Sequence, residues 1–223
     1  MQQLPSQASQ PCLLCGAGVR GKQLCPGCLA DLPWLPADRC TQCALPSHQG
    51  MLCGQCLRTP RAFDHTEALL SYEFPLNALV RQCKYHGALE ITRLFADLLA
   101  QHLEHRTRAD LILPMPLHPA RLAERGFNQA GEIARRLSRQ LAIPWLTEGC
   151  QRIRDTPSQA GLDLKARRRN LRGAFRCDLD LTGRRVALVD DVMTSGTSLD
   201  ELARTVKRAG ALEVQAWVVA RTL

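Results

Sequence analysis

Two adjacent carboxylates followed by a small, hydroxyl-rich turn form the part of this chain best suited to chemistry. Asp190 and Asp191 follow the apolar run 186–189, whose β-branched pattern is typical of a strand buried in a parallel sheet. Residues 194–198 (Thr-Ser-Gly-Thr-Ser) then offer hydroxyls and successive N–H groups at the start of a helix predicted over 197–209. Such a turn binds phosphate, and the neighbouring acids can accept hydrogen bonds from ribose hydroxyls or hold Mg²⁺ through water. The pattern therefore predicts a phosphosugar site.

This run resembles the motif that binds phosphoribosyl pyrophosphate (PRPP) in type I phosphoribosyltransferases, namely apolar residues, two acids, then Thr-Ser-Gly-Thr-Ser. The resemblance implies that Asp190 and Asp191 contact the ribose 2′ and 3′ hydroxyls and that residues 194–198 surround the 5′-phosphate. An ordinary strand-to-helix turn, capped by Asp191 or Thr194, is the alternative. The PRPP-binding residues expected here are Asp190, Asp191, Val192, Met193, Thr194, Ser195, Gly196, Thr197 and Ser198.

Eight of the eleven cysteines lie in the first quarter of the chain as four Cys-x-x-Cys pairs, and the second two pairs repeat the first two after 28 residues. Each repeat supplies four thiolates, the ligand set of a closed structural zinc site, so we expect two Zn²⁺ ions and no zinc catalysis. Sequential pairing of the ligands is the simplest, but a crossed pairing would give the same sequence. The expected ligands are Cys12, Cys15, Cys25, Cys28, Cys40, Cys43, Cys53 and Cys56.

Length and composition limit the class of protein. A chain of 223 residues with 45% hydrophobic residues accommodates one α/β domain and a small appendage. We find no basic-then-apolar signal segment and no apolar run of membrane-spanning length, so we expect a cytoplasmic protein without a membrane span. A reducing compartment favours metal over disulfides, and tandem pairs disfavour an iron–sulfur cluster or a redox motif. The net charge of +8 indicates anionic partners, either phosphorylated small molecules or nucleic acid.

The chain divides into a double zinc ribbon at residues 1–62 and an α/β domain at residues 63–223. The ribbon has too few large apolar residues for a core of its own, so zinc must supply much of its folding free energy. Apolar segments separated by amphipathic helices predict a twisted, mainly parallel sheet of the type I phosphoribosyltransferase kind. The predicted strands are residues 66–72, 110–113, 186–189 and 214–220.

A proline-punctuated loop and a basic segment follow the second predicted strand. Pro-Met-Pro-Leu-His at 114–118 leads to Arg-Leu-Ala-Glu-Arg-Gly-Phe-Asn-Gln at 121–129, and Lys-Tyr-His-Gly stands at 84–87. With the cysteine-rich start, these resemble the ComF/GntX family, which joins a zinc ribbon to a phosphoribosyltransferase-type domain. The resemblance implies that the loop cradles pyrophosphate, and Lys84 is a further candidate phosphate ligand in a predicted basic turn. The residues expected at the pyrophosphate are Met115, Leu117, His118, Arg121 and Arg125.

Residues 150–176 carry eight Lys or Arg against two acids. Their polar, weakly periodic sequence predicts a mobile loop, and such a loop beside a pyrophosphate would close as a lid. A patch that binds polyanions and a solvated surface are the alternatives. The flap residues singled out are Arg152, Arg154, Thr156, Gln159, Arg168 and Arg169.

We therefore expect a PRPP-binding phosphoribosyltransferase-like protein that transfers the phosphoribosyl group to an unknown nitrogen acceptor, with Mg²⁺ bound alongside PRPP. Asp190, Asp191 and Lys84 are the expected catalytic residues. The resemblance places this activity in nucleotide metabolism or in DNA uptake and utilisation. The alternative is a non-catalytic accessory factor for DNA uptake that senses PRPP or binds single-stranded DNA or another uptake protein, although aromatic residues for stacking are few. The sequence does not indicate the acceptor or the oligomeric state.

Overall fold

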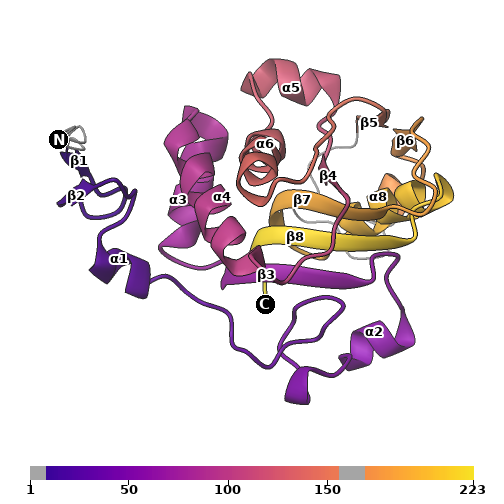
Figure 1. Cartoon of the computed structure of the whole chain (residues 1–223), viewed down its shortest axis with the longest axis horizontal. Helices are drawn as coiled ribbons and strands as arrows, with labels where there is room; N and C mark the ends of the chain where they lie inside the picture. The colour runs from indigo at the N-terminus through magenta and orange to yellow at the C-terminus, as the bar shows by residue number, and fades with distance from the viewer. Residues whose placement is uncertain (1–8, 156–168) are drawn as a thin grey trace, which may run out of the picture.

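The computed structural model describes residues 9–155 and 169–223, and its centre is a four-stranded parallel sheet (Figure 1). The strands lie in the order β3-β8-β7-β4, and every neighbouring pair is parallel. Their bounds are β3 (His65–Ser71), β8 (Glu213–Arg221), β7 (Arg185–Met193) and β4 (Leu111–Pro114). The predicted α/β architecture with a mainly parallel sheet is confirmed.

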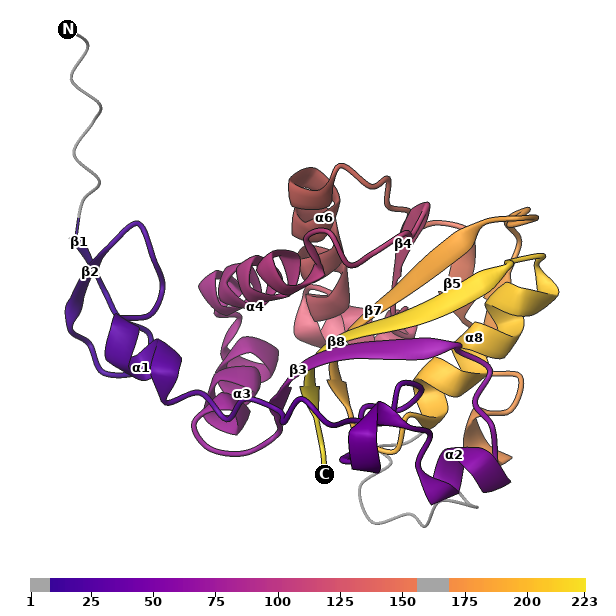
Figure 2. The same cartoon turned by 60° about the horizontal axis from the view of Figure 1, so that its bottom comes forward.

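Helices cover both faces of this sheet (Figure 2). Alternate side chains of β8 belong to different cores, since Trp217 and Val219 pack with one set of helices and Ala216 and Val218 with α8. A strand buried on both faces needs the continuous apolar sequence seen in β7 and β8. The helices of the first face are α3 (Leu76–His86), α4 (Leu89–Leu103) and α6 (Gln129–Leu141), and the second face carries α8 (Thr197–Arg208).

The cysteine-rich region contains two copies of one backbone turn. In the first, the Cys12 N–H donates to Ala17 at 2.8 Å and the Gly16 N–H donates to Cys12 at 2.9 Å. In the second, Cys40 and Ala44 donate the equivalent bonds to Leu45 and Cys40, both at 2.8 Å. The repeat is therefore structural as well as sequential. Its remaining elements are β1 (Ser9–Pro11), β2 (Gly18–Arg20), α1 (Pro26–Ala30), the 3-10 turn η1 (His48–Gly50) and α2 (Gly54–Arg58).

Both outer strands of the sheet are covered along their edges. Residues 33–35, between the two ribbon halves, run beside β3, with the Leu35 N–H donating to Leu69 at 2.9 Å and the Ser71 N–H to Pro33 at 2.7 Å. Residues 144–146 run beside β4, where the Ile112 N–H donates to Pro144 at 2.9 Å. Covered edges leave no template for pairing with another chain. The ribbon thus completes the sheet.

Two predicted boundaries differ from the structure. Lys84 was expected in a turn, but α3 continues to His86 and ends at Gly87, whose φ of +65° allows the left-handed cap. The basic segment 121–129, whose arginines and polar residues indicate one helix after the proline-punctuated loop, instead contributes to two. The first is α5 (Pro119–Arg125), which ends at Gly126 with φ of +80°, and the second is α6. The strand through 186–189 is confirmed, and it extends to Met193, opposite Arg221 of β8.

The basic flap is ordered at its base, which the sequence did not predict. β5 (Cys150–Arg152) and β6 (Phe175–Cys177) pair as antiparallel strands, with Cys150 opposite Cys177. Thr156, Gln159 and Arg168 lie outside the described residues. Within the described residues, no helix is both long and apolar enough to cross a membrane.

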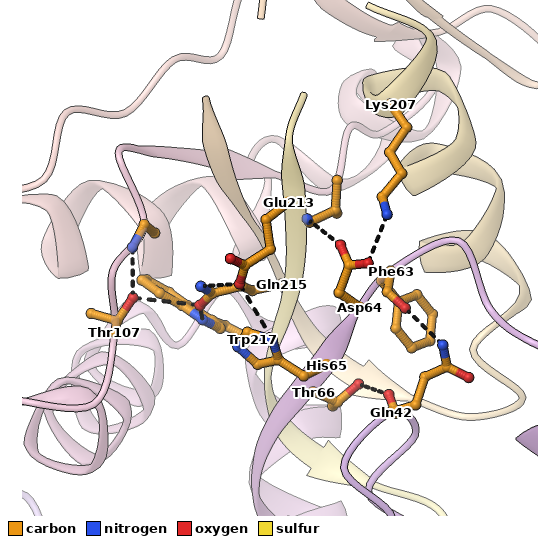
Figure 3. A network of polar contacts seen from close by, with 12 residues as sticks. Gln42, Phe63, Asp64, His65, Thr66, Thr107, Lys207, Glu213, Gln215 and Trp217 are labelled. Atoms are coloured by element: carbon orange, nitrogen blue, oxygen red, sulfur yellow. Dashed lines mark hydrogen bonds and ion pairs between the residues drawn. The ribbon is translucent and has the colours of Figure 1, made fainter. Parts of the chain in front are cut away.

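A polar network holds the start of β3 against β8 and the ribbon (Figure 3). The carboxylate of Asp64 accepts from the Val214 N–H at 2.8 Å and from Lys207 Nζ at 2.7 Å. Thr66 donates from Oγ1 to the Gln42 carbonyl at 2.6 Å, which attaches the second ribbon half to the same strand. This corner joins the two parts of the chain.

We expect Asp64→Ala to lower the free energy of unfolding by about 1–3 kcal/mol, because the buried Val214 N–H loses its acceptor. Lys207→Met removes only the exposed ion pair and should cost about 1 kcal/mol or less. Urea denaturation followed by circular dichroism measures both. Equal losses from the two variants would show that the Val214 bond does not stabilise this corner.

Candidate functional site

A cavity of about 380 Å³ lies beyond the carboxyl ends of β4 and β7. Open α/β sheets bind ligands at this edge, where loops rather than ladder bonds end the strands. Its walls come from loops and helices far apart in the sequence. The lining residues are Tyr72, Lys84, Tyr85, Met115, Leu117, Arg121, Arg125, Asn128, Gln129, Ala130, Arg152, Asp190, Asp191, Val192, Thr194 and Ser198.

Two carboxylates and one ammonium form the charged centre of the cavity. Alternate residues of a strand face the same side of a sheet, so Asp191 lies on the face of Ala187 and Val189, which α3 covers. Its Oδ2 lies 2.9 Å from Lys84 Nζ. Burial opposes the charge of Lys84, but the attraction of Asp191 and Asp190 outweighs it and raises the Lys84 pKa. Lys84 is therefore a charged partner of Asp191.

Asp190 lies next to Asp191 in the chain, and its Oδ1 accepts from the Asp191 N–H at 2.9 Å. Burial, followed by repulsion from Asp191, raises the pKa of Asp190 to about 7. Two adjacent acids thus lie beside one lysine, and Asp190 is an acid that titrates near neutral pH. A ligand that supplies hydroxyls or positive charge would favour its ionised form.

The β7–α8 loop, residues 194–196, presents the start of a 12-residue helix to the cavity. Gly196 has φ of +73°, a left-handed conformation that any residue with a Cβ adopts at a cost. Ser195 Oγ and Thr197 Oγ1 lie 2.8 Å apart, and the Asp200 N–H donates to the Gly196 carbonyl at 2.9 Å. Thr194 and Ser198 line the cavity on either side of this turn. The arrangement suits an anion at the helix N-terminus.

The β4–α5 loop forms the opposite wall. The Met115 N–H donates to Val189 at 2.8 Å, which continues the sheet pairing past the end of β4. Asn128 donates from Nδ2 to the Met115 carbonyl at 3.0 Å, while its Oδ1 accepts from the Ala130 N–H at 3.1 Å. One side chain therefore caps α6 and fixes the loop.

Cations outnumber acids around the cavity, since Lys84, Arg121, Arg125 and Arg152 face only Asp190 and Asp191 among its lining. Two of these arginines are held in place. Arg125 donates from Nη1 to Gln129 Oε1 at 2.9 Å. The Arg152 guanidinium lies 5.9 Å from the centre of the Phe175 ring. The cavity favours a ligand with several negative charges.

The structure brings together many, but not all, of the predicted site residues. Met193 is 1% exposed and packs in the core behind the loop. His118 accepts the Ala120 N–H at its Nδ1, at 3.3 Å, as the N-cap of α5. Arg154 and Arg169 are exposed. The predicted residues outside the lining are His118, Arg154, Arg169, Met193, Ser195, Gly196 and Thr197.

Sequence reasoning missed the two tyrosines of the cavity. Tyr72 directly follows β3, so the rule that parallel strands end at one edge could have found it. Tyr85 is 74% exposed and adjoins Lys84 in α3, where only knowledge of how α3 packs would place it. Asn128 and Gln129 were quoted in a motif but not assigned to the site, and Ala130 was not singled out.

The eight ribbon cysteines form two compact groups, which shows the sequential pairing of the ligands. All Sγ atoms within each group lie within 4.8 Å of one another, with Cys15 and Cys25 3.7 Å apart and Cys43 and Cys53 3.6 Å apart. Sulfurs about 2.3 Å from a tetrahedral Zn²⁺ lie about 3.8 Å apart, so both groups fit zinc. The groups are Cys12, Cys15, Cys25, Cys28 and Cys40, Cys43, Cys53, Cys56.

Each group contains one thiol whose pKa is lowered, whereas hydrogen bonds with neighbouring thiols raise the pKa of Cys28 and burial raises that of Cys56. Burial opposes the Cys12 thiolate, but backbone N–H groups of Cys15 in the same turn and of Cys25 in the next Cys-x-x-Cys pair lower its pKa to about 6. In the second group burial likewise opposes Cys53, yet its hydrogen bonds lower the pKa to about 7. Thiolates are the zinc-binding form.

Comparison with known proteins agrees with this architecture. A double zinc ribbon model matches residues 4–57 and a phosphoribosyl transferase domain model matches residues 88–222. The chain is 38% identical over 191 residues to DNA utilization protein YhgH of Escherichia coli O157:H7, covering 82% of this chain and 84% of that protein. It is 34% identical over 208 residues to Competence protein F of Haemophilus influenzae, covering 89% and 90%.

Among solved structures, an adenine phosphoribosyltransferase from Leishmania tarentolae aligns with a TM-score of 0.43 at 11% identity, over 69% of this chain and 91% of that chain. The family models define the class, a phosphoribosyltransferase domain preceded by a double zinc ribbon. With relatives at this identity over most of its length, the chain belongs to the ComF/GntX family.

We expect the purified chain to contain two zinc ions, because each repeat holds a complete set of four thiolates. Inductively coupled plasma mass spectrometry measures the ratio of zinc to protein. Acid titration should release zinc as the thiolates protonate, with half of the release below pH 7, because bound metal competes with protons for the sulfur. A ratio of one zinc, or bound iron, would contradict the assignment.

Proposed function

We propose that this protein binds PRPP in the cavity beyond β4 and β7 and transfers its phosphoribosyl group to a nitrogen nucleophile. The observation that carries the proposal is that one cavity combines two carboxylates, a helix N-terminus and several cations. Asp190 and Asp191 lie on one wall beside the N-terminus of α8, and a set of cations faces them. A sugar with a phosphate at one end and a pyrophosphate at the other has the matching distribution of hydroxyls and charge.

Each wall then has its own task. Asp190 and Asp191 accept hydrogen bonds from the ribose hydroxyls, and the β7–α8 loop holds the 5′-phosphate with its N–H groups and hydroxyls. Arg121, Arg125 and Arg152 stabilise the pyrophosphate. Lys84 pairs with Asp191 at 2.9 Å and adds positive charge to the same space.

The reaction breaks the bond between C1′ and the pyrophosphate oxygen and forms a bond between C1′ and nitrogen, and the nucleophile loses its proton. Positive charge develops on the ribose ring while negative charge collects on the leaving pyrophosphate. Residues that fix the ribose and neutralise the pyrophosphate lower this barrier without a dedicated base. The hard oxygens of Asp190 and Asp191 also suit Mg²⁺ held through water, which would add positive charge when it is bound with PRPP.

The names of the relatives favour a second candidate function. They describe DNA utilization in Escherichia coli and competence in Haemophilus influenzae. A protein with this cavity that serves DNA use without catalysis would bind PRPP as a signal, or bind single-stranded DNA itself. The excess of positive charge, +8 for the chain, is compatible with a polyanion.

We expect PRPP with Mg²⁺ to bind the wild-type protein and to bind Asp190→Asn and Asp191→Asn at least about tenfold more weakly, because a hydrogen bond to a carboxylate contributes about 1.5–3 kcal/mol. Isothermal titration calorimetry with and without Mg²⁺ measures the affinities. Asp178→Asn is the matched control, because Asp178 is an exposed acid away from the cavity whose carboxylate accepts from Arg176.

Equal heats from the wild type and both cavity variants would refute the PRPP site. Binding without pyrophosphate release, tested with a panel of nitrogen nucleophiles, would favour the sensing role. Salt-dependent binding of a single-stranded oligonucleotide in the absence of any PRPP binding would favour the DNA-binding role.

The raised pKa of Asp190 gives a further prediction. Its folded-state pKa of about 7 means that the free site is largely protonated at pH 6, whereas ribose hydroxyls and Mg²⁺ favour the carboxylate. Binding at pH 6 should therefore release close to one proton, and the release should vanish above about pH 8.5. Calorimetry in buffers of different ionisation enthalpy measures it. Release that persists in Asp190→Asn would assign the proton to another group.

A further inference from the structure

Arg221, the last residue of β8, lies buried between the ribbon and the candidate site. Its side chain is 3% exposed, and its Nε donates to the Cys43 carbonyl at 2.8 Å. Its Nη1 donates to the Met193 carbonyl at 3.1 Å, to the Thr222 carbonyl at 2.6 Å and to the Thr194 carbonyl. All four acceptors are main-chain carbonyls, which carry no net charge.

A buried guanidinium bonded to neutral carbonyls needs an anion nearby. The second cysteine group supplies one, since Cys43 both accepts the Arg221 bond and belongs to that group. Four thiolates outnumber the two positive charges of Zn²⁺, so the zinc-bound group stays negative. Burial lowers the pKa of Arg221, and the charges of Cys43 and Cys56 oppose that shift.

The same side chain fixes the beginning of the β7–α8 loop. Met193 and Thr194 give it two consecutive carbonyls, and the Thr222 N–H donates to the Met193 carbonyl at 3.0 Å. Thr194 lines the cavity. The path from Cys43 to the cavity therefore passes through one arginine and one peptide unit.

The first cysteine group has a different position. Cys12 packs in the core cluster of α3 and α4, and nearby Gln23 donates to Asp97 of α4 at 3.3 Å. The second group forms its own small cluster, beside the residues that Arg221 contacts. Two sites of equal chemistry thus support different parts of the domain.

We propose that Arg221 is a positioning residue that couples the second zinc site to the β7–α8 loop. With zinc bound by Cys40, Cys43, Cys53 and Cys56, the arginine holds the Met193 and Thr194 carbonyls and so the orientation of the N–H groups after them. Loss of this zinc loosens the loop, whereas loss of the first zinc does not. The consequence for PRPP affinity rests on the proposed function, but the effect on the loop does not.

Cys53→Ser and Cys25→Ser are the matched test, because the two positions correspond across the repeat of 28 residues. Each full-length variant should keep one zinc ion. In Cys53→Ser we expect the amides of residues 194–198 to exchange at least about tenfold faster with deuterium, the size of effect that loss of one charged hydrogen bond gives. Cys25→Ser should exchange there as the wild type does.

Arg221→Lys and Arg221→Gln test the link itself with both zinc ions retained. Lysine keeps the charge but not the planar fork, so it should loosen the loop less than glutamine. Arg39→Gln is the control, because Arg39 also joins the ribbon to the sheet, by donating to the Ala68 carbonyl. It should leave exchange at residues 194–198 unchanged. If Cys53→Ser does not fold, the Arg221 variants test whether this arginine orders the β7–α8 loop.

Equal exchange in Cys53→Ser and Cys25→Ser, or no change in Arg221→Gln, would overturn the coupling. Hydrogen exchange is measured without PRPP, so a wild type that fails to bind PRPP would refute the proposed function and leave this test intact. Where the wild type binds PRPP, Cys53→Ser should weaken binding at least about tenfold and Cys25→Ser should leave it unchanged.

Discussion

The contact between Lys84 and Asp191, 2.9 Å apart and largely out of solvent, determines how the candidate site is built. Two adjacent acids at the end of a buried strand cannot both remain ionised without a nearby cation. The last turn of α3 provides it, so α3 must lie against the carboxyl end of β7. Tyr85 enters the cavity from the same turn. The apolar packing of α3 thus brings a cation to Asp191, while burial and the charge of Asp191 raise the pKa of Asp190 to about 7.

The sequence predicted most where function depends on neighbouring residues. Asp190, Asp191 and the hydroxyl turn act as one strand-to-helix connection, and Cys12 with Cys15 belongs to one short turn, so spacing alone identifies them. It predicted less where function depends on packing. The sequence singled out Lys84, but its contact with Asp191 follows from the docking of α3. Tyr72 reaches the site because β3 ends beside β8. Local patterns do not indicate how α3 docks against the sheet, whereas the end of β3 at the shared edge is the signal that could have indicated Tyr72.

The ribbon is part of the same architecture. Residues 33–35 pair with the outer edge of β3, and Thr66 and Gln42 tie the second half to the start of that strand. An isolated ribbon has little apolar surface to bury, so zinc and the sheet together provide its order. In return the sheet gains a covered edge. The ribbon and the sheet therefore stabilise each other.

Arg221 shows why the two halves of the ribbon have different consequences. Arg221 is buried at the end of β8, and the groups that accept its hydrogen bonds are uncharged carbonyls. Its positive charge therefore needs a negative group nearby. The second cysteine group lies opposite, and in its turn Ala44 takes φ of +58° where the first has Gly16 at +75°. A methyl group in that conformation costs about 1–2 kcal/mol. It is nonetheless 1% exposed in the core cluster that also contains Met193, so packing against the domain offsets the strain. The two halves thus keep the same turn but differ in residue type next to Cys43, whose carbonyl accepts the Arg221 bond.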